Sequence, residues 1–506
     1  MFRYNPPVIS QTFIFTKILA TVGPSSQSVE VLERLIEEGV RVFRLNFSHG
    51  SFESFAAMLA NIRKAEEAVG QPVAVLGDLC GPKIRVGKVA EGGIELQPGQ
   101  HVVFQRQDIV AQPVSDPTEP VVFSTTFPPL IDDVQPGQRL LVDDGNVRML
   151  VLDHVGEGED RKLVCSVTVG GLVTTRKGIN LPDTDLNVPS ITDYDWQCAA
   201  WAIENEVDYL ALSFVRQASD VNELKRYLHA NRKADGRAIP VIAKIEMPQA
   251  IRHLEAIVRE ADGVMVARGD LGVEMDLAQV PIIQKQIIRL AHDYGKPVIV
   301  ATQMLQSMID APTPTRAEVS DVANAIYDGA DAVMLSGETA VGKYPVQAVH
   351  TMARIAVATE ADMRANSSDW DRPPRKLQET RYRTAALAHG VSVVVRDLDA
   401  KLVITWSQNA GGARYLSQNR LHVPIIAASS NPAALRHMCL MFGVCPIALK
   451  PPADAEQFIA LMDQVILDRA WANPGDAAVY VMGETLGISG ITNKLQIHYI
   501  GDVCRL

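Results

Sequence analysis

The feature that most restricts the fold of this chain is an alternation of short apolar segments with helix-like segments. The apolar segments lie at 16–23, 40–47, 72–79, 207–214, 240–246, 262–269, 297–304 and 330–337. Each is rich in β-branched residues and nearly apolar throughout, which is typical of strands buried in a parallel sheet. Amphipathic segments follow them, the first after Ser28, a residue type that caps helices. Eight strand–helix units predict a closed (β/α)8 barrel.

Residues 88–175 interrupt the alternation after the third apolar segment. They carry turn signals and short strand-like runs, among them 139–144 and 162–169, which predict an all-β domain. An insertion at this point stands over the carboxyl ends of the barrel strands, where barrel enzymes place their active sites. We therefore expect the β domain to act as a lid. The barrel itself is expected to comprise residues 1–87 and 176–365.

A charged, proline-containing segment at 367–383 predicts a domain boundary. The apolar segments of a second strand–helix series follow at 401–407, 423–429, 444–449, 476–483 and 494–501. Helix-like segments separate the first four, and the last two can pair as a hairpin. Residues 366–506 are therefore expected to form an α/β domain around a mostly parallel sheet.

Composition excludes several classes of function. The 506 residues carry a formal net charge of −11, so a nucleic-acid partner, which requires a broad basic face, is not expected. The six cysteines show no CxxC spacing, which argues against a disulfide framework or a zinc site. We expect a cytoplasmic protein without a membrane partner, because the sequence has neither a signal-peptide pattern nor an apolar run of about 18 residues.

Polar residues gather at the ends of the predicted barrel strands, where side chains point toward the site. They are Thr21; Arg44, Asn46, Ser48 and His49; Asp78, Lys83 and Arg85; Ser213; Lys244 and Glu246; Arg268 and Asp270; Thr302; and Ser336 and Glu338. Lys244 and Glu246 are two residues apart on one strand, so both side chains leave by the same face. Glu246 and Asp270 end neighbouring strands and are placed to share one Mg²⁺ or Mn²⁺ ion. A buried ion-pair network that braces the barrel is the alternative.

Cations surround the expected metal position, which suits a substrate with carboxylate and phosphate groups. Lys244 and Arg268 would place positive charge beside the metal. A second set comprises Arg44, His49, Arg85 and Lys177. Because the guanidinium fork binds pairs of phosphate oxygens, the second set suits a polyphosphate. Solvated arginines and a structural histidine are the alternative.

Ten segments, in order along the chain, resemble the pyruvate kinase family. They are TKILATVGPSS, RLNFSHG, GPKIRVG, VDDG, KGINLP, VDYLALSFVRQASDV, VIAKIEMPQAI, GVMVARGDLGVE, VATQML and PTPTRAEVSDVANAIYDGADAVMLSGETAVGKYP. The resemblance implies the same barrel, lid and C-terminal domain. It also implies a phosphotransferase of the last step of glycolysis, which transfers the phosphoryl group of phosphoenolpyruvate to ADP and protonates the enolate, giving pyruvate and ATP. A homotetramer is implied as well.

The resemblance implies a role for each matching residue. Glu246 and Asp270 bind Mg²⁺, and the catalytic residues are Lys244, Thr302, Arg44 and Arg85. The substrate-binding residues are Arg44, Lys244, Ala267, Arg268, Gly269, Asp270 and Thr302, and the nucleotide-binding residues are Asn46, His49, Arg85 and Lys177. Lys244 would neutralise charge on the phosphoryl group and on the enolate. Because threonine is a poor acid, a water chain behind Thr302 is expected to deliver the proton.

The resemblance also concerns a monovalent cation. Many members bind K⁺ through residues that match Asn46, Ser48, Asp78 and the carbonyl of Leu79, and these members commonly carry Glu where this chain has Lys83. An ammonium group there would supply the positive charge that K⁺ brings. We therefore expect activity without K⁺. A solvated Lys83 beside an intact K⁺ site is the alternative.

Two single residues depart from the family pattern near the site. Met247 follows Glu246 where a polar residue is common, which affects fine geometry and not the reaction. Cys80 would be sensitive to oxidants if Lys83 and Arg85 favoured its thiolate. We expect inert packing of Cys80, and oxidant sensitivity is the alternative.

The C-terminal domain carries an effector-like segment. Thr405, Ser407, Gly411 and Gly412 lie where regulated members bind sugar phosphates, and they can form a nest for a phosphorylated effector. The segment 483–493 resembles a second glycine-rich loop of the family. An ordinary strand-to-helix turn is the alternative for both.

Two other functions share part of this pattern. A catalytically silent relative that binds phosphorylated metabolites would lack Lys244 or a metal carboxylate, and this chain retains them. A Mg²⁺-dependent aldolase or lyase that acts on a pyruvate enolate would share Glu246 and Asp270. It would not explain the second set of cations or the lid.

Overall fold

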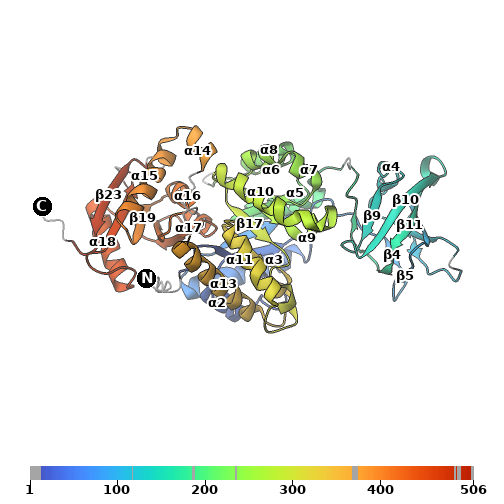
Figure 1. The fold of residues 1–506 in the computed structure, drawn as a ribbon, viewed down its shortest axis with the longest axis horizontal. Helices are drawn as coiled ribbons and strands as arrows, with labels where there is room; N and C mark the ends of the chain where they lie inside the picture. Colours follow the sequence, from blue (N-terminus) through green and yellow to red (C-terminus); the bar gives the residue numbers. More distant parts are fainter. Residues whose placement is uncertain are drawn as a thin grey trace.

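A computed structural model describes residues 13–502 apart from 117, 185–187, 234–235, 367–373, 484–485 and 487–491. Three parts follow one another along its long axis, with a barrel between a C-terminal α/β domain and a β domain (Figure 1). Among these residues, no helix is both long and apolar enough to cross a bilayer.

The predicted barrel is confirmed. Its strands are β1 (Lys17–Thr21), β2 (Val40–Asn46), β3 (Ala74–Asp78), β14 (Tyr209–Leu212), β15 (Val241–Ile245), β16 (Gly263–Ala267), β17 (Val298–Ala301) and β18 (Ala332–Leu335). All neighbours are parallel, and β1 pairs with β18 to close the sheet. Most strand residues are buried on both faces, since inward side chains fill the barrel and outward ones pack on helices.

The helices of the barrel follow the predicted order. They are α2 (Val29–Glu37), α3 (Phe52–Val69), α5 (Asp193–Glu204), α6 (Ala218–Ala230), α7 (Pro248–Arg252), α8 (Leu254–Glu260), α10 (Val280–Asp293), α11 (Arg316–Tyr327) and α13 (Pro345–Asn366). Ser28 caps α2 by accepting a hydrogen bond from the Val31 amide. The segment 248–260 forms two short helices that meet at His253.

The inserted domain lies between β3 and β14, as expected. Its main sheet has the order β13 (Ile179–Asn180), β9 (Arg139–Val142), β10 (Val147–Val155), β11 (Lys162–Val169), β6 (His101–Gln105) and β8 (Val121–Ser124). It has its own core, in which the rings of Phe104 and Phe123 stack at 5.8 Å. Because β13 belongs to this sheet, the chain still contacts the insertion beyond residue 175. The domain boundaries themselves stay a prediction.

The C-terminal domain is the predicted α/β unit. Its sheet has the order β21 (Val444–Ala448), β20 (Ile425–Ser429), β19 (Leu402–Trp406), β22 (Ala477–Met482) and β23 (Lys494–Tyr499). The first four are parallel and β23 is antiparallel to β22. Its helices are α15 (Arg383–Asp397), α16 (Gly411–Gln418), α17 (Pro432–Met438) and α18 (Ala455–Asp468). Most of the loop 483–493 and part of the segment 367–383 lie outside the described residues.

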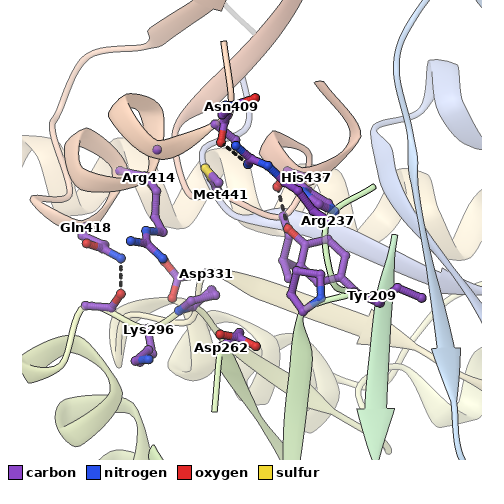
Figure 2. Close-up of a pocket in the computed structure, with 18 of the residues that line it drawn as sticks. Tyr209, Arg237, Asp262, Lys296, Asp331, Asn409, Arg414, Gln418, His437 and Met441 are labelled. Carbon is purple, nitrogen blue, oxygen red and sulfur yellow. Dashed lines mark hydrogen bonds between the residues drawn. The ribbon is translucent and has the colours of Figure 1, made fainter. Parts of the chain in front are cut away.

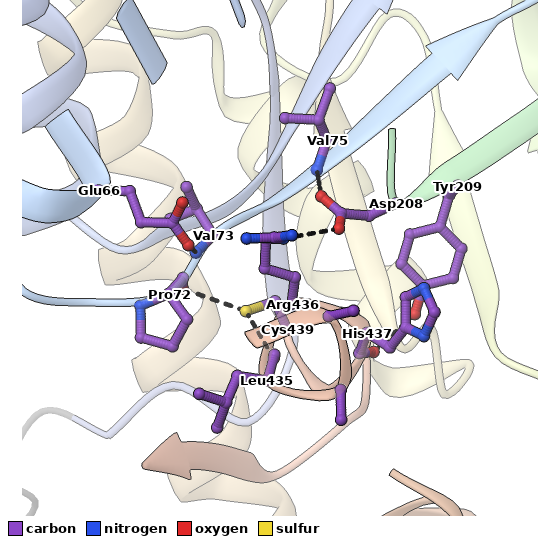
Figure 3. A network of polar contacts seen from close by, with 12 residues as sticks. Glu66, Pro72, Val73, Val75, Asp208, Tyr209, Leu435, Arg436, His437 and Cys439 are labelled. Atoms are coloured by element: carbon purple, nitrogen blue, oxygen red, sulfur yellow. Dashed lines mark hydrogen bonds and ion pairs between the residues drawn. The ribbon is translucent and has the colours of Figure 1, made fainter. Parts of the chain in front are cut away.

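Polar contacts join α17 to the barrel at the amino-terminal ends of the strands. The Asp208 carboxylate accepts hydrogen bonds from Arg436 Nε at 2.9 Å and from the Val75 amide at 2.8 Å (Figure 3). Arg63 donates a third at 2.8 Å. These contacts seat the C-terminal domain on the end of the barrel opposite to the inserted β domain.

Candidate active site

A buried cluster of charges lies at the carboxyl ends of the barrel strands, centred on Lys244 of β15. Its ammonium nitrogen lies 2.6 Å from Ser213 Oγ, 3.3 Å from Glu246 Oε2 and 3.5 Å from Asp78 Oδ1. Burial alone would lower the pKa of Lys244, but the two carboxylates outweigh it and raise the pKa. The site therefore holds a permanent positive charge in a place with little solvent.

Glu246 is the carboxylate best suited to a metal. Its Oε1 accepts a hydrogen bond of 2.6 Å from the Phe214 amide, whereas Oε2 is buried and accepts no hydrogen bond. Burial raises the pKa of Glu246, and the nearby Asp270 acts in the same direction while Lys244 opposes it. A bound cation would contact Oε2, which has Lys244 as an ion-pair partner but accepts no hydrogen bond, and would offset the repulsion between the two carboxylates.

Asp270 supplies the second carboxylate from the first turn of α9 (Arg268–Glu274), and it is partly exposed. Among the described residues, no group of three or more His, Cys, Asp or Glu side chains is placed to hold a metal. Two carboxylates, with water and substrate at the other positions, are a common protein contribution to Mg²⁺ binding. The residues present thus fit a hard divalent ion.

Asp78 fixes Arg44. Its Oδ2 accepts from Arg44 Nε at 2.7 Å and pairs with Nη2 at 2.7 Å, while Arg44 Nη1 reaches Thr21 Oγ1 at 3.2 Å. Burial would raise the pKa of Asp78, but Lys244 and Arg44 outweigh burial and lower it. Asp78, which the resemblance assigns to a K⁺ site, here is an ionised bridge between two cations.

Thr302 links the end of β17 to α9. Its hydroxyl accepts from the Gly269 amide at 2.7 Å and donates to the Ala301 carbonyl at 2.6 Å. Thr302 has φ +68°, a left-handed conformation that costs a β-branched residue free energy. The buried Ala267 ends β16 immediately before α9. The hydrogen bond between Thr302 and Gly269 positions the turn that carries Asp270.

The structure gives Arg268 a carboxylate partner that the sequence did not predict. Its guanidinium donates to Asp321 Oδ1 at 2.7 Å and to the Thr302 carbonyl at 2.9 Å, and it is buried. Asp321, on α11, therefore neutralises the charge that the sequence interpretation placed beside the metal. Arg268 braces α9 against α11, and Lys244 is the cation that contacts Glu246.

The second cation set is partly assembled. Burial, followed by Arg85, Lys83 and Arg44, lowers the pKa of His49, which indicates that these four side chains share one region. Lys177 instead forms an ion pair of 2.6 Å with Asp143 in the turn after β9. To bind a nucleotide, it would have to leave that carboxylate.

The proposed K⁺ ligands have other partners in this structure. The Leu79 carbonyl accepts from Ser213 Oγ at 2.7 Å, and Asn46 Oδ1 accepts from the Ser48 amide at 3.2 Å. Lys83 is exposed, and its Cε lies close to Gly178.

The surroundings of Cys80 favour inert packing over a reactive thiolate. Burial raises the pKa of the Cys80 thiol, and Asp195 and Asp78 act in the same direction. The Cys80 amide donates to Asp195 Oδ1 at 2.8 Å. Burial and these two carboxylates outweigh the hydrogen bond with Ser48 and the charge of Lys244, both of which lower the pKa, so the thiolate is not favoured.

Sequence reasoning missed a contact between the insertion and the barrel. Asn180 of β13 donates a 2.7 Å hydrogen bond to Glu274 Oε1 at the end of α9. Burial raises the pKa of Glu274 to about 7, with Asp270 and Glu246 acting in the same direction. Glu274 follows Asp270 by four residues on one helix, a spacing that could have indicated a shared face. Glu338, in contrast, is a brace that accepts from the Leu305 and Ser336 amides.

Comparison with known proteins identifies the family. One family model, pyruvate kinase barrel domain, matches residues 14–349, and another, pyruvate kinase alpha/beta domain, matches residues 385–498. The chain belongs to the pyruvate kinase family. A pyruvate kinase from Corynebacterium glutamicum is 39% identical over 491 residues, which cover 97% of this chain and 98% of that protein. One from Mycobacterium tuberculosis is 40% identical, with 96% and 98% covered.

A solved pyruvate kinase from Cryptosporidium parvum has the same fold. It superposes with a TM-score of 0.86 at 34% identity, covering 96% of each chain. Membership of the pyruvate kinase family makes this chain a kinase with a divalent metal cofactor.

Proposed function

We propose that this chain transfers the phosphoryl group of phosphoenolpyruvate to ADP, yielding pyruvate and ATP, with Mg²⁺ or Mn²⁺ as the divalent metal. The observation that carries the proposal is Lys244, whose side chain is 12% exposed, beside Glu246, whose second oxygen accepts no hydrogen bond, with Asp270 close by. An aldolase or lyase would not need the group of Arg44, His49 and Arg85, which suits a polyphosphate.

Glu246 and Asp270 would hold the metal, which when bound supplies positive charge to the phosphoryl oxygens. Lys244 is held in place by Ser213 and two carboxylates, so its ammonium needs no reorganisation as negative charge develops on the phosphoryl group and the enolate. Arg44 is aligned by Asp78 to contact phosphate. Arg85, His49, Asn46 and Lys177 would bind the nucleotide.

The last step adds a proton to the enolate carbon. The Thr302 hydroxyl already donates to the Ala301 carbonyl, so it is not free to donate to substrate without breaking that bond. This supports delivery of the proton by water, with Thr302 and Gly269 positioning the turn. The Ala267, Arg268 and Gly269 backbone at the start of α9 would receive the substrate carboxylate, for which the Gly269 amide would have to leave Thr302 Oγ1.

A coupled assay tests this function. Pyruvate should form from phosphoenolpyruvate only when ADP and Mg²⁺ or Mn²⁺ are both present, and EDTA should abolish it. Pyruvate release that does not depend on ADP would favour a lyase, and absence of pyruvate would favour a catalytically silent relative. Either result would overturn the proposal.

We further propose that the chain needs no K⁺, because Lys83 brings a cation to the region of His49 and Arg44. Activity should change less than about twofold when tetramethylammonium replaces K⁺, whereas Lys83→Glu should become strongly K⁺-dependent. Lys88→Glu, on an exposed lysine of the insertion, is the matched control. A large loss of wild-type rate without K⁺ would contradict the proposal.

The C-terminal domain supports a phosphorylated effector near the start of α16. Thr405 Oγ1 is buried without a hydrogen bond, and a Cβ at Gly412 would lie 3.5 Å from it. Sugar phosphates should shift the phosphoenolpyruvate saturation curve of the wild type and not of Thr405→Val.

We also propose a homotetramer, which light scattering of the purified chain would test.

A further inference from the structure

Two adjacent residues directly after β14, Ser213 and Phe214, hold both members of the charged pair in the candidate active site. Ser213 Oγ lies 2.6 Å from Lys244 Nζ, and the Phe214 amide donates a 2.6 Å hydrogen bond to Glu246 Oε1. Glu246 Oε2 accepts no hydrogen bond and has Lys244 at 3.3 Å as an ion-pair partner. The backbone therefore fixes Oε1, and Oε2 is the oxygen left to a further ligand.

The backbone of Phe214 is strained. Its φ of +55° lies in the left-handed region, which a bulky residue rarely adopts. Such a conformation costs free energy and persists only where the surrounding structure holds it. Because β14 precedes Phe214 and the buried Val215 follows it, the chain is fixed on both sides. A different φ would displace the peptide unit that carries the Phe214 amide.

The loop after β3 holds the Phe214 ring in place. A Cβ at Gly81 would overlap Phe214 Cδ2 and would lie 3.3 Å from Ser213 Cβ. Gly81 itself has φ +65°, so both the space and the backbone at this position require glycine. The ring of Phe214 thus packs directly on the backbone of residue 81, and this contact maintains the strained conformation.

Asp195, a fully buried residue of α5, anchors the Gly81 loop. Its Oδ1 accepts hydrogen bonds from the Cys80 amide at 2.8 Å and from the Gly81 amide at 3.2 Å. Its Oδ2 accepts from the Thr192 amide at 2.9 Å and from the Thr192 hydroxyl at 2.6 Å. A continuous set of contacts therefore leads from the first turn of α5 through Gly81 to Phe214.

We propose that Phe214 is a positioning residue for the divalent metal, because its left-handed backbone aims the amide at Glu246 Oε1 and so presents Oε2 to the ion. This inference rests on the proposed function, in which Glu246 is a metal ligand. A carboxylate that is already oriented needs no rearrangement when the ion binds. Hydrogen-bond partners of metal ligands typically change metal affinity by about 10- to 100-fold.

Binding of Mn²⁺ alone to the full chain, measured by electron paramagnetic resonance of the free ion, tests this role without turnover. Phe214→Ala and Phe214→Gly both remove the ring, but only alanine resists the left-handed conformation. Phe214→Ala should raise the dissociation constant of Mn²⁺ about tenfold. Phe214→Gly should bind Mn²⁺ about fivefold more tightly than Phe214→Ala. If Phe214 only filled space, the two variants would bind Mn²⁺ equally.

Two further variants complete the test. Asp195→Asn leaves Phe214 in place but weakens the anchor of the Gly81 loop, so it should raise the dissociation constant severalfold. Glu206→Gly is the matched control, because Glu206 also has a left-handed φ, +54°, but precedes β14 at the opposite end of the barrel. It should leave the affinity for Mn²⁺ unchanged.

Two outcomes would overturn the positioning role alone. One is wild-type affinity for Mn²⁺ in Asp195→Asn and in Phe214→Ala, each shown to be folded by circular dichroism. The other is equal affinity in Phe214→Ala and Phe214→Gly. A wild type that does not bind Mn²⁺ would overturn the proposed metal site together with this inference.

Discussion

At the scale of single residues, His292 on α10 is a largely buried histidine close to both the Arg420 guanidinium and the Asp331 carboxylate. Burial, and then Arg420, whose Nη1 lies 3.4 Å from His292 Nε2, lower the pKa of His292 to about 3. The unfolded chain takes up a proton at this residue below pH 6.5, whereas the folded chain does not. The contribution of neutral His292 to the free energy of unfolding is therefore present above pH 6.5 and is lost as the pH falls toward 3.

We expect the free energy of unfolding of the wild type to fall more than that of His292→Asn between pH 7.5 and 5. Because 27% of the side chain is exposed, the difference should be at most about 2 kcal/mol. Burial also raises the pKa of the neighbouring Asp331 to about 6, but Asp331 is present in both proteins. Urea unfolding across this range measures the effect, with His101→Asn in the insertion as control. An equal pH dependence of the free energy of unfolding in the wild type and in His292→Asn would contradict this prediction.

The sequence predicted which residues end the barrel strands, but not how their charges pair. Lys244 and Glu246 share a face because strand geometry requires it, and they do meet. The partner of Arg268 could not be predicted, since Asp321 lies on a helix more than 50 positions away. The same holds for Lys177 with Asp143 and for Cys80 with Asp195. Contacts between distant elements depend on packing that no local pattern records.

At the scale of elements, the Asn180–Glu274 hydrogen bond joins the insertion to the helix that carries Asp270. Asn180→Leu would leave a second buried oxygen of Glu274 without a donor. We expect a loss of about 1–3 kcal/mol in unfolding free energy and a lower kcat/KM for phosphoenolpyruvate. Asn146→Leu, which removes an exposed amide within the insertion, is the control. Identical kcat/KM values for the two variants would contradict this coupling.

The interface between α17 and the barrel depends on one buried carboxylate. Asp208→Ala would leave Arg63 and Arg436 without their shared partner. It should lower the free energy of unfolding by about 3–5 kcal/mol. Arg436→Met should cost less, because Asp208 keeps Arg63 and the Val75 amide. Denaturant unfolding of the two variants measures this order. The reverse order would show that the interface rests on other contacts.

At the scale of the whole molecule, the sequence predicted the architecture well because the period of apolar residues changes at each boundary. Strands near 16–23 and 330–337 were predicted separately, and closure of the sheet brings them together as β1 and β18. A cavity between the barrel and the C-terminal domain (Figure 2) had no counterpart in the sequence analysis, because it forms only where strand beginnings meet α16 and α17. Its residues are spread from 209 to 441.

Lys244, Glu246 and Asp270 are proposed to support phosphoryl transfer from phosphoenolpyruvate to ADP. Phosphorus NMR of the wild type with phosphoenolpyruvate, ADP and Mg²⁺ follows that transfer directly. We expect the substrate signal to be replaced by the γ-phosphate of ATP, and Lys244→Met to slow this about 10²- to 10³-fold while remaining folded by circular dichroism. Free phosphate in place of ATP, or an unchanged rate in folded Lys244→Met, would contradict the claim.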